Sequence, residues 1–300
     1  MSDEDKRELL EATDVAKQAG SDVAAAYGDE MQSLPAQARV THIPLLGHRI
    51  ATTGFLVNDD ADYWSLPPRH VYRTNDAGER EPFDLAMTVI EAVTRKACVK
   101  AVIHGCVCRA SFDCQNYPQD VGCMFLGEAA RGVPREDGLM VDVEGALEHV
   151  RRALDAGLVP TLAWEWDMML YGGKQNEGLA VCFCDYCHCD LRLSAREGTE
   201  RFRRKFESVP TLTPFVGAAC KLCGTCSRDE VCCVSAISQG PESAEIDASV
   251  CIRCGRCADV CPEEAISFEI PAGADVVALL MAELGAVTDL TGPAGEGSAS

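Results

Sequence analysis

Apolar residues recur every three or four positions in several parts of the chain, which is the spacing of a helix face. The clearest pattern ends at Gly157, a residue suited to a helix C-terminal cap. Another begins at Pro82, which suits a first helical turn. We therefore expect helices over residues 2–27, 82–97, 121–131, 143–157 and 271–289.

Shorter apolar runs are typical of strands, which we expect over residues 39–43, 99–104 and 158–166. Residues 58–81 are rich in Asp, Pro, Gly and Asn, but Tyr63 and Trp64 favour an ordered loop there. Because helices and strands alternate over residues 82–190, the sequence predicts a mixed α/β domain in that part.

The 300 residues are enough for one large domain or two ordinary ones. No run approaches the roughly 20 apolar residues of a membrane span, and the acidic first residues do not resemble a secretory leader. We therefore expect a cytoplasmic protein. The formal charge of -20 argues against nucleic acid as a partner. It favours either solubility or an acidic face for docking a partner.

Cysteine spacing carries the strongest chemical signal. A reducing cytoplasm disfavours disulfides, so the clustering of the 18 cysteines indicates metal ligands. Cys251, Cys254, Cys257 and Cys261, followed by Pro262, have the C-x2-C-x2-C-x3-C-P spacing of bacterial [4Fe–4S] ferredoxins. Two intervening residues let successive thiolates wrap one cube, and the proline turns the chain away without offering an N–H group.

A second half-motif precedes the first. It has the same first three positions, at Cys220, Cys223 and Cys226. An Ala-Ile pair lies four and five residues after Cys261 and again after Cys232. This repeat favours Cys232 as the fourth ligand of the half-motif, with Cys233 as the alternative.

In two-cluster ferredoxins the fourth cysteine of one half ligates the cluster of the other half. The predicted ligands of cluster one are Cys220, Cys223, Cys226 and Cys261. The predicted ligands of cluster two are Cys251, Cys254, Cys257 and Cys232. Five residues separate Cys226 from Cys232, where the ferredoxin spacing has three. A [3Fe–4S] cluster or an empty site in this half is therefore an alternative.

Eight more cysteines form two upstream groups. They are Cys106, Cys108, Cys114 and Cys123, then Cys182, Cys184, Cys187 and Cys189. Four thiols suffice for a zinc ion or a [4Fe–4S] cube, so each group predicts a metal site, and the two groups could also combine. His104 and His188 are spare ligand candidates. Thiol redox chemistry or structural cysteines are the alternative. Cys98 stands apart and is expected to be a buried small apolar residue.

Together these segments resemble the uncharacterised bacterial and archaeal 4Fe-4S-binding proteins of ferredoxin type. The resemblance rests on Cys106-x-Cys108-Arg109 with Cys114 and Cys123, on Gly145–His149 and Ala156–Val159, and on the block Cys182–Cys189 ahead of the two half-motifs. It covers roughly residues 82–270 and implies electron transfer in anaerobic metabolism, without identifying a substrate. Cys233 in place of a proline and the lengthened loop depart from the pattern.

The predicted fold class is α+β, with a mixed α/β domain carrying Cys-rich loops followed by a ferredoxin-like 2[4Fe–4S] domain. The expected parts are a helical and loop region (1–81), an α/β Cys-rich domain (82–190), a basic linker (191–214), the ferredoxin domain (215–270) and a helix with a disordered tail (271–300). Residues 191–207 carry six basic and three acidic side chains. We expect an exposed linker helix there, or a docking site for an acidic partner.

The leading hypothesis is an iron–sulfur electron-transfer protein, a component of a larger oxidoreductase system. It would hold two [4Fe–4S] clusters, with an additional Fe–S cluster or Zn at the upstream cysteines. Its partner would be a redox protein such as a flavoprotein or an oxidoreductase subunit. The alternatives are an oxidoreductase whose catalytic metal or cluster is held upstream near residues 164–167, and a redox or metal sensor. Because no dinucleotide fingerprint, P-loop or H-E-x-x-H is present, a carrier is favoured over an autonomous enzyme.

Overall fold

The computed structural model describes residues 61–111, 113–164, 174–197 and 200–292. The helix expected over 2–27 and the strand expected over 39–43 lie outside these residues, as does most of the expected tail. The described part combines helices with strands, so the α+β class is confirmed. No helix in it is long and apolar enough to cross a membrane.

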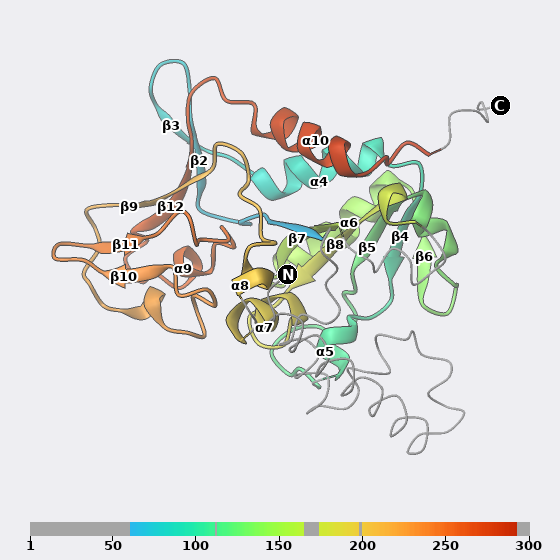
Figure 1. Cartoon of the computed structure of the whole chain (residues 1–300), viewed down its shortest axis with the longest axis horizontal. Coiled ribbons are helices and arrows are strands. Elements are labelled where there is room, and N and C mark those ends of the chain that lie inside the picture. Colours follow the sequence, from blue (N-terminus) through green and yellow to red (C-terminus); the bar gives the residue numbers. More distant parts are fainter. Residues whose placement is uncertain (1–60, 112, 165–173, 198–199, 293–300) are drawn as a thin grey trace, which may run out of the picture.

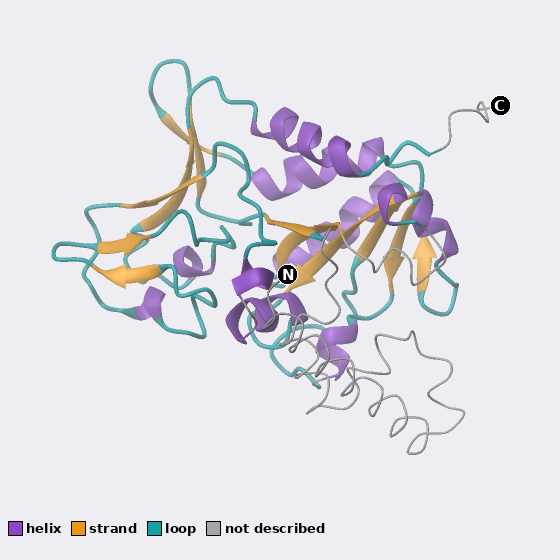
Figure 2. Ribbon diagram, in the orientation of Figure 1, coloured by secondary structure: helices purple, strands orange, loops and turns teal. Residues whose placement is uncertain are grey.

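A six-stranded antiparallel sheet is the centre of one half of the molecule (Figures 1 and 2). Its order is β1–β7–β8–β5–β4–β6, and each neighbouring pair is antiparallel. The strands are β1 (Asp62–Ser65), β4 (Lys100–Ile103), β5 (Met124–Gly127), β6 (Gly138–Met140), β7 (Val159–Trp164) and β8 (Gly178–Cys184). The long strands β7 and β8 are almost fully buried and lie side by side within it.

Three helices form a layer over one face of this sheet (Figure 2). They are α4 (Leu85–Lys96), α6 (Val143–Asp155) and α10 (Val276–Val287), and α4 contacts the other two. Each begins at an aspartate, Asp84, Asp142 or Asp275, whose carboxylate accepts a hydrogen bond from the backbone N–H three residues on. The caps fix where each helix starts, and the buried apolar faces hold the layer against the sheet.

The other face of the sheet is covered by short helices that follow the cysteine-bearing ends of the strands or the cysteine block. The short α5 (Val107–Ser111) follows β4, and α7 (Asp190–Glu197) and α8 (Glu200–Arg203) follow β8. Ala195 of α7 and Phe202 of α8 pack in one buried cluster with Ala101 and Ala180 of the sheet. Ile252 of the ferredoxin motif joins the same cluster, so that motif is packed against the sheet.

The ferredoxin half-motifs share a second sheet with the beginning of the described chain. Its order is β3–β2–β12–β9, and β12 runs parallel to β2 and antiparallel to β9. The strands are β2 (Val71–Thr74), β3 (Arg80–Pro82), β9 (Thr213–Val216) and β12 (Ile266–Ile270). A hairpin of β10 (Ile237–Gln239) and β11 (Ala244–Ile246), the helix α9 (Arg256–Asp259) and the 3-10 turn η5 (Thr225–Ser227) complete this half.

Two expected elements are wrong. Residues 121–131, expected to be helical, form β5 and the 3-10 helix η2 (Glu128–Gly132), because the apolar run at 124–126 is buried between β4 and β8. Residues 58–81, expected to be a loop, contain β1 and β2 and the start of β3. The expected helix 82–97 starts later, at Leu85, because Asp84 caps it.

Two side chains also differ from expectation. Cys98, expected to be buried, is exposed and lies 3.7 Å from the Glu128 carboxylate. Arg192, placed by the sequence in an exposed basic linker, is only 6% exposed. It belongs to α7, which packs between the sheet and the ferredoxin half-motifs. The helices expected over 143–157 and 271–289 and the strands expected over 99–104 and 158–166 are confirmed within a few residues of their predicted ends, although 165 and 166 are outside the described residues.

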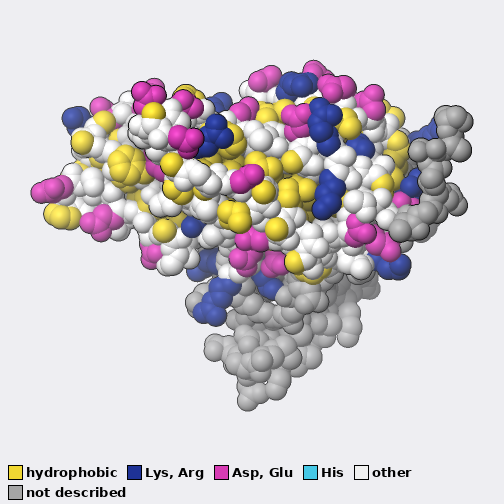
Figure 3. All heavy atoms as spheres, turned by 90° about the horizontal axis from the view of Figure 1, so that it is seen from above, with side chains coloured by type: hydrophobic (Ala, Val, Ile, Leu, Met, Phe, Trp, Pro, Cys, Tyr) yellow, Lys and Arg dark blue, Asp and Glu magenta, His cyan; other side chains and the backbone are white. Residues whose placement is uncertain are grey.

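The face seen in Figure 3 carries acidic and basic side chains side by side, with apolar side chains between them. The mixture extends along the whole visible length of the described residues. This face therefore does not concentrate one sign of charge, although the chain as a whole carries -20.

Candidate metal centres

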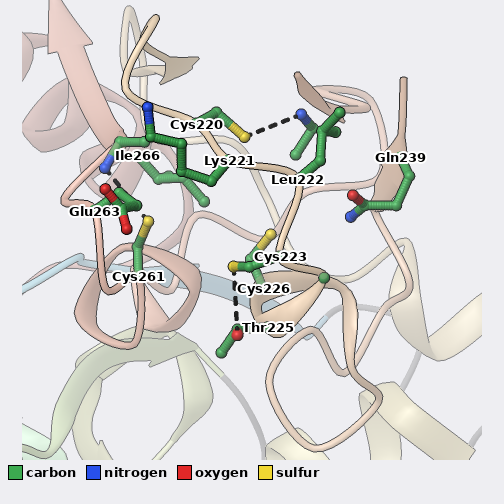
Figure 4. Close-up of a pocket in the computed structure, with 13 residues that line it drawn as sticks. Cys220, Lys221, Leu222, Cys223, Thr225, Cys226, Gln239, Cys261, Glu263 and Ile266 are labelled. Atoms are coloured by element: carbon green, nitrogen blue, oxygen red, sulfur yellow. Dashed lines mark hydrogen bonds between the residues drawn. The ribbon is translucent and has the colours of Figure 1, made fainter. Parts of the chain in front are cut away.

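The predicted ligands of cluster one line a single pocket. Cys220, Cys223, Cys226 and Cys261 lie around one small pocket that is partly open to solvent (Figure 4). Burial raises the pKa of Cys226, and the thiols of the other three cysteines raise it further, as expected of sulfurs facing a common centre. The structure thus brings Cys261 of the second half-motif to the three cysteines of the first.

The predicted ligands of cluster two also lie around one centre. Burial raises the pKa of Cys257 well above its ordinary value, and Cys254, Cys251 and Cys232 add to that rise. Burial likewise raises the pKa of Cys251 to about 12. Thiols this hard to ionise are stable as thiolates when a metal neutralises them, so the chemistry of this set fits a cluster.

The backbone of one half-motif repeats that of the other. Residues with a left-handed backbone occupy matched positions in the two half-motifs. Leu222 and Arg253 precede the second cysteine of their half-motif, and Gly224 and Gly255 follow it. Ser235 and Glu264 lie three residues after the fourth cysteine, Cys232 or Cys261. Such conformations turn successive N–H groups inward, which suits an anionic centre. A built cradle is therefore present in both halves.

The fourth cysteines are matched in their hydrogen bonds. The Ala265 N–H donates to Cys261 Sγ at 3.3 Å, and the Ala236 N–H donates to Cys232 Sγ at 3.2 Å. Cys233 is instead buried in the apolar cluster that covers the sheet, and burial raises its pKa to about 11. Cys232, rather than Cys233, therefore occupies the position in its half-motif that Cys261 occupies in the other.

The two cysteine sets differ in their access to solvent. Cys223 is exposed, and its hydrogen bonds with Thr225, whose hydroxyl lies 3.5 Å from the sulfur, lower its pKa. Leu222 beside it is 38% exposed. The Cys251 set has no exposed cysteine. The first set is therefore closer to solvent than the second.

Strand pairing in the sheet brings cysteines of the two upstream groups side by side. The register pairs Met124 with Val181, and one step outward the Cys123 and Cys182 sulfurs lie 3.7 Å apart. Gly122 is required here, since a Cβ at this position would meet the Ile103 carbonyl oxygen at 2.5 Å. The pairing of β5 with β8 thus brings Cys123 of the first group to Cys182 of the second, and the glycine lets the residue before Cys123 lie close to the end of β4.

Other upstream cysteines interact within their own group. Cys106 is buried, and its hydrogen bond with Cys108, followed by the nearby Arg109 charge, lowers its pKa to about 7. A hydrogen bond with Cys184 and burial raise the pKa of Cys189 well above its ordinary value. The Cys106 thiol is therefore readily ionised, whereas the Cys189 thiol resists ionisation.

Tyr117 and its neighbour connect the groups further. The Asn116 side chain lies 3.5 Å from Cys187 Sγ. Burial raises the pKa of Tyr117, and the Cys187 and Cys114 sulfurs contribute to that rise from opposite groups. His104, by contrast, points its ring to the Arg135 carbonyl at 3.3 Å.

Arg109 is the structural link between the upstream groups. Its side chain is fully buried, and its guanidinium donates to the carbonyls of Pro118 and Phe183, both at 2.8 Å, and of Val121. Nη1 also lies 3.8 Å from the Asp185 carboxylate. One cation thus ties the loop after α5 to the end of β8.

Sequence reasoning missed Asp185. Its carboxylate is fully buried, Oδ1 accepts from the N–H groups of Cys187 and His188 at 2.6 and 2.5 Å, and Oδ2 has no hydrogen-bond partner. Ligand atoms of these three residues lie within 4.8 Å of one another, and no other set of three His, Cys, Asp or Glu ligands in the described residues is that compact. The sequence feature that could have identified Asp185 is its position as an acidic residue inside the block Cys182–Cys189.

Comparison with known proteins identifies one part of the chain. A family model described as a 4Fe-4S binding domain matches residues 244–267, which contain all four cysteines from Cys251 to Cys261. No curated protein and no solved structure matches the chain. The match shows an iron–sulfur module of ferredoxin type, supports at least one [4Fe–4S] cluster and points to electron transfer.

Proposed function

We propose that this protein is a two-cluster iron–sulfur carrier that serves as the electron-transfer component of a larger oxidoreductase system. The observation that supports this most is the exchange of fourth cysteines, with Cys261 in the pocket of the first half-motif and Cys232 beside the second. When bound, each [4Fe–4S] cube supplies one-electron redox chemistry. The 18 thiols suit the reducing cytoplasm that we assign to the protein.

The residues present provide the cradles. Inward N–H groups and the N–H···S bonds from Ala236 and Ala265 offset the negative charge of a thiolate-bound cube. The Ala244 N–H, in the hairpin over the first pocket, donates to Cys220 at 3.4 Å. These bonds favour retention of the clusters.

Electrons would enter or leave at cluster one. Cys223 is exposed and the pocket is partly open, while Leu222 offers an apolar contact beside it. A redox protein such as a flavoprotein or an oxidoreductase subunit would dock there and exchange single electrons. The exposed Cys223, a predicted ligand of this cluster, supports this side as the port.

The upstream cysteines would hold an additional centre, an Fe–S cluster or Zn. Support comes from the interleaving of the two groups around Arg109, with sulfurs from both groups 3.7 Å apart. Anaerobic iron, sulfide and zinc analysis of the pure protein tests both proposals. About 8 Fe per chain indicates two cubes and about 12 indicates three. Fewer than about 6 Fe would refute the two-cluster proposal.

Cys232 and Cys233 form a matched pair for the ligand assignment. Cys232→Ala should lose one cluster signal in the electron paramagnetic resonance spectrum of the reduced protein. Cys233→Ala, one residue away, should keep both signals and the wild-type iron content. The reverse pattern would move the ligand to Cys233 and shift the register by one.

A second function, an oxidoreductase with a catalytic metal, is favoured by the compact set of Asp185, Cys187 and His188. A carboxylate, a thiolate and an imidazole leave a fourth position for substrate, as in catalytic zinc sites. Asp185→Asn should then remove one metal ion per chain while the iron of the two cubes stays. Unchanged metal content would reject this function for the site.

A further inference from the structure

Arg192 is a buried cation between the upstream cysteine block and the cysteines of cluster two. It lies in α7, three residues after Cys189, and is 6% exposed. Its Nη2 is 3.5 Å from the Val231 carbonyl, the residue directly before Cys232. Figure 1 shows α7 on the side of the sheet half that faces the ferredoxin half. The side chain therefore reaches out of one half toward the cluster of the other.

The guanidinium faces the sulfurs of that cluster. It makes a hydrogen bond with Cys254, a predicted ligand of cluster two, and its charge also acts on Cys233. The same charge acts on Cys232, the predicted fourth ligand of that cluster. Arg192 Nε is buried and has no hydrogen-bond partner, so a donor remains available at this place.

A tyrosine of the upstream block holds the guanidinium in position. The Tyr186 ring lies between two arginines, with Arg192 Cζ 4.5 Å and Arg256 Cζ 4.1 Å from its centre. Its hydroxyl lies 3.3 Å from the Asp259 carboxylate. This stack restrains a long side chain that would otherwise have many rotamers, so the charge stays beside Cys254.

We propose that Arg192 raises the reduction potential of cluster two, with Tyr186 as its positioning residue. This inference rests on the proposed two-cluster function. Reduction adds a negative charge to the cube, and burial disfavours that added charge. A buried guanidinium next to a ligand sulfur stabilises the reduced form, and its charge is little screened where water is excluded. The buried cluster can then accept an electron from the exposed one.

Redox titration of the full chain, monitored by electron paramagnetic resonance, tests this inference. The signal changed by Cys254→Ser identifies cluster two. Arg192→Gln should shift its midpoint to a more negative value by at least about 59 mV, a tenfold change in a one-electron equilibrium. Cluster one should keep its midpoint. Arg192→Lys, which retains a cation, should shift cluster two less than Arg192→Gln does.

Lys221→Gln is the matched control because Lys221 lies between cysteines of cluster one but is exposed. Removing this screened charge should shift cluster one by less than Arg192→Gln shifts cluster two. Unchanged midpoints of both clusters in Arg192→Gln would overturn the inference.

If Arg192→Gln does not retain its iron, Tyr186→Leu decides. This variant keeps the charge but removes the stacking surface, so a more negative midpoint of cluster two supports the inference and two unchanged midpoints overturn it. A wild-type protein with fewer than two cluster signals would instead refute the proposed function itself, so the two failures are distinguishable.

Discussion

Replacing Arg109 tests whether one buried cation holds the upstream cysteine groups together. Arg109→Met would keep most of the aliphatic volume but remove every donor. Three carbonyls, of Pro118, Val121 and Phe183, would lose their partner, and the buried Asp185 carboxylate would lose its counter-charge. The substitution should therefore be among the most destabilising available in the described chain.

The magnitude follows from these lost partners. Breaking a buried ion pair by removing one member costs about 3–5 kcal/mol. A buried acceptor left without a donor costs about 1–3 kcal/mol, but these terms overlap and the loops can partly relax. We expect a loss of about 4 kcal/mol. With a urea m-value of about 3 kcal/mol per molar, the unfolding midpoint should fall by about 1.3 M.

Urea unfolding, followed by circular dichroism under anaerobic conditions at one fixed incubation time, measures this loss. Arg151→Met is the matched control, since Arg151 and Glu148 form an exposed pair on α6, and such pairs contribute about 0–1 kcal/mol. Adding Asp185→Asn to Arg109→Met should recover part of the stability by removing the unpaired charge. A midpoint within about 0.2 M of the wild type, by the same m-value reasoning, would refute the role of Arg109.

Three further predictions concern single positions. Gly255→Ala should destabilise the protein more than Gly224→Ala in thermal unfolding: both have positive φ, but a Cβ at 255 meets Pro67 at 3.0 Å while 224 faces open space, and equal losses would contradict this. Cys98→Ser should remove one solvent-accessible thiol from the native protein and leave the iron content unchanged, because Cys98 is exposed; lost iron would make it a ligand. Burial lowers the pKa of His149, so its stabilisation is complete above the unfolded pKa of about 6.5 and is lost as the pH falls toward the folded pKa. His149→Gln should therefore flatten the stability profile below about pH 6.5, and an unchanged slope would refute the assignment.

Cysteine spacing predicted the iron–sulfur motif at Cys251–Cys261 better than periodicity predicted the fold. The fixed geometry of a cube is reflected in local sequence, so Cys251 to Cys261 were recognisable from spacing alone. Burial against neighbouring strands is not local. Residues 124–126 form β5 because β4 and β8 pair with them. Their short apolar run alone does not distinguish a strand from a segment of buried helix.

Charge composition was the weakest guide to the position of a side chain. Six basic residues within 191–207 read as an exposed helix, yet Arg192 is buried against Tyr186 and the cysteines of cluster two. The sequence analysis named Arg109 in a motif but missed its pairing with Asp185, because a buried ion pair across 76 positions has no periodic signal. These residues are visible only once β8 lies beside the loop after α5.

The ferredoxin segment is built into the rest of the chain rather than attached to it. Its strand β12 lies between β9 and β2, and the chain continues from β12 into α10, which packs on α4. Arg192 crosses in the other direction, from the sheet half toward Cys254. In the proposed two-cluster carrier, the ligands of cluster two would be buried by contacts from both halves, so its potential would depend on residues outside the motif. The motif would then specify which cluster is held, and the surrounding fold would set how readily that cluster accepts an electron.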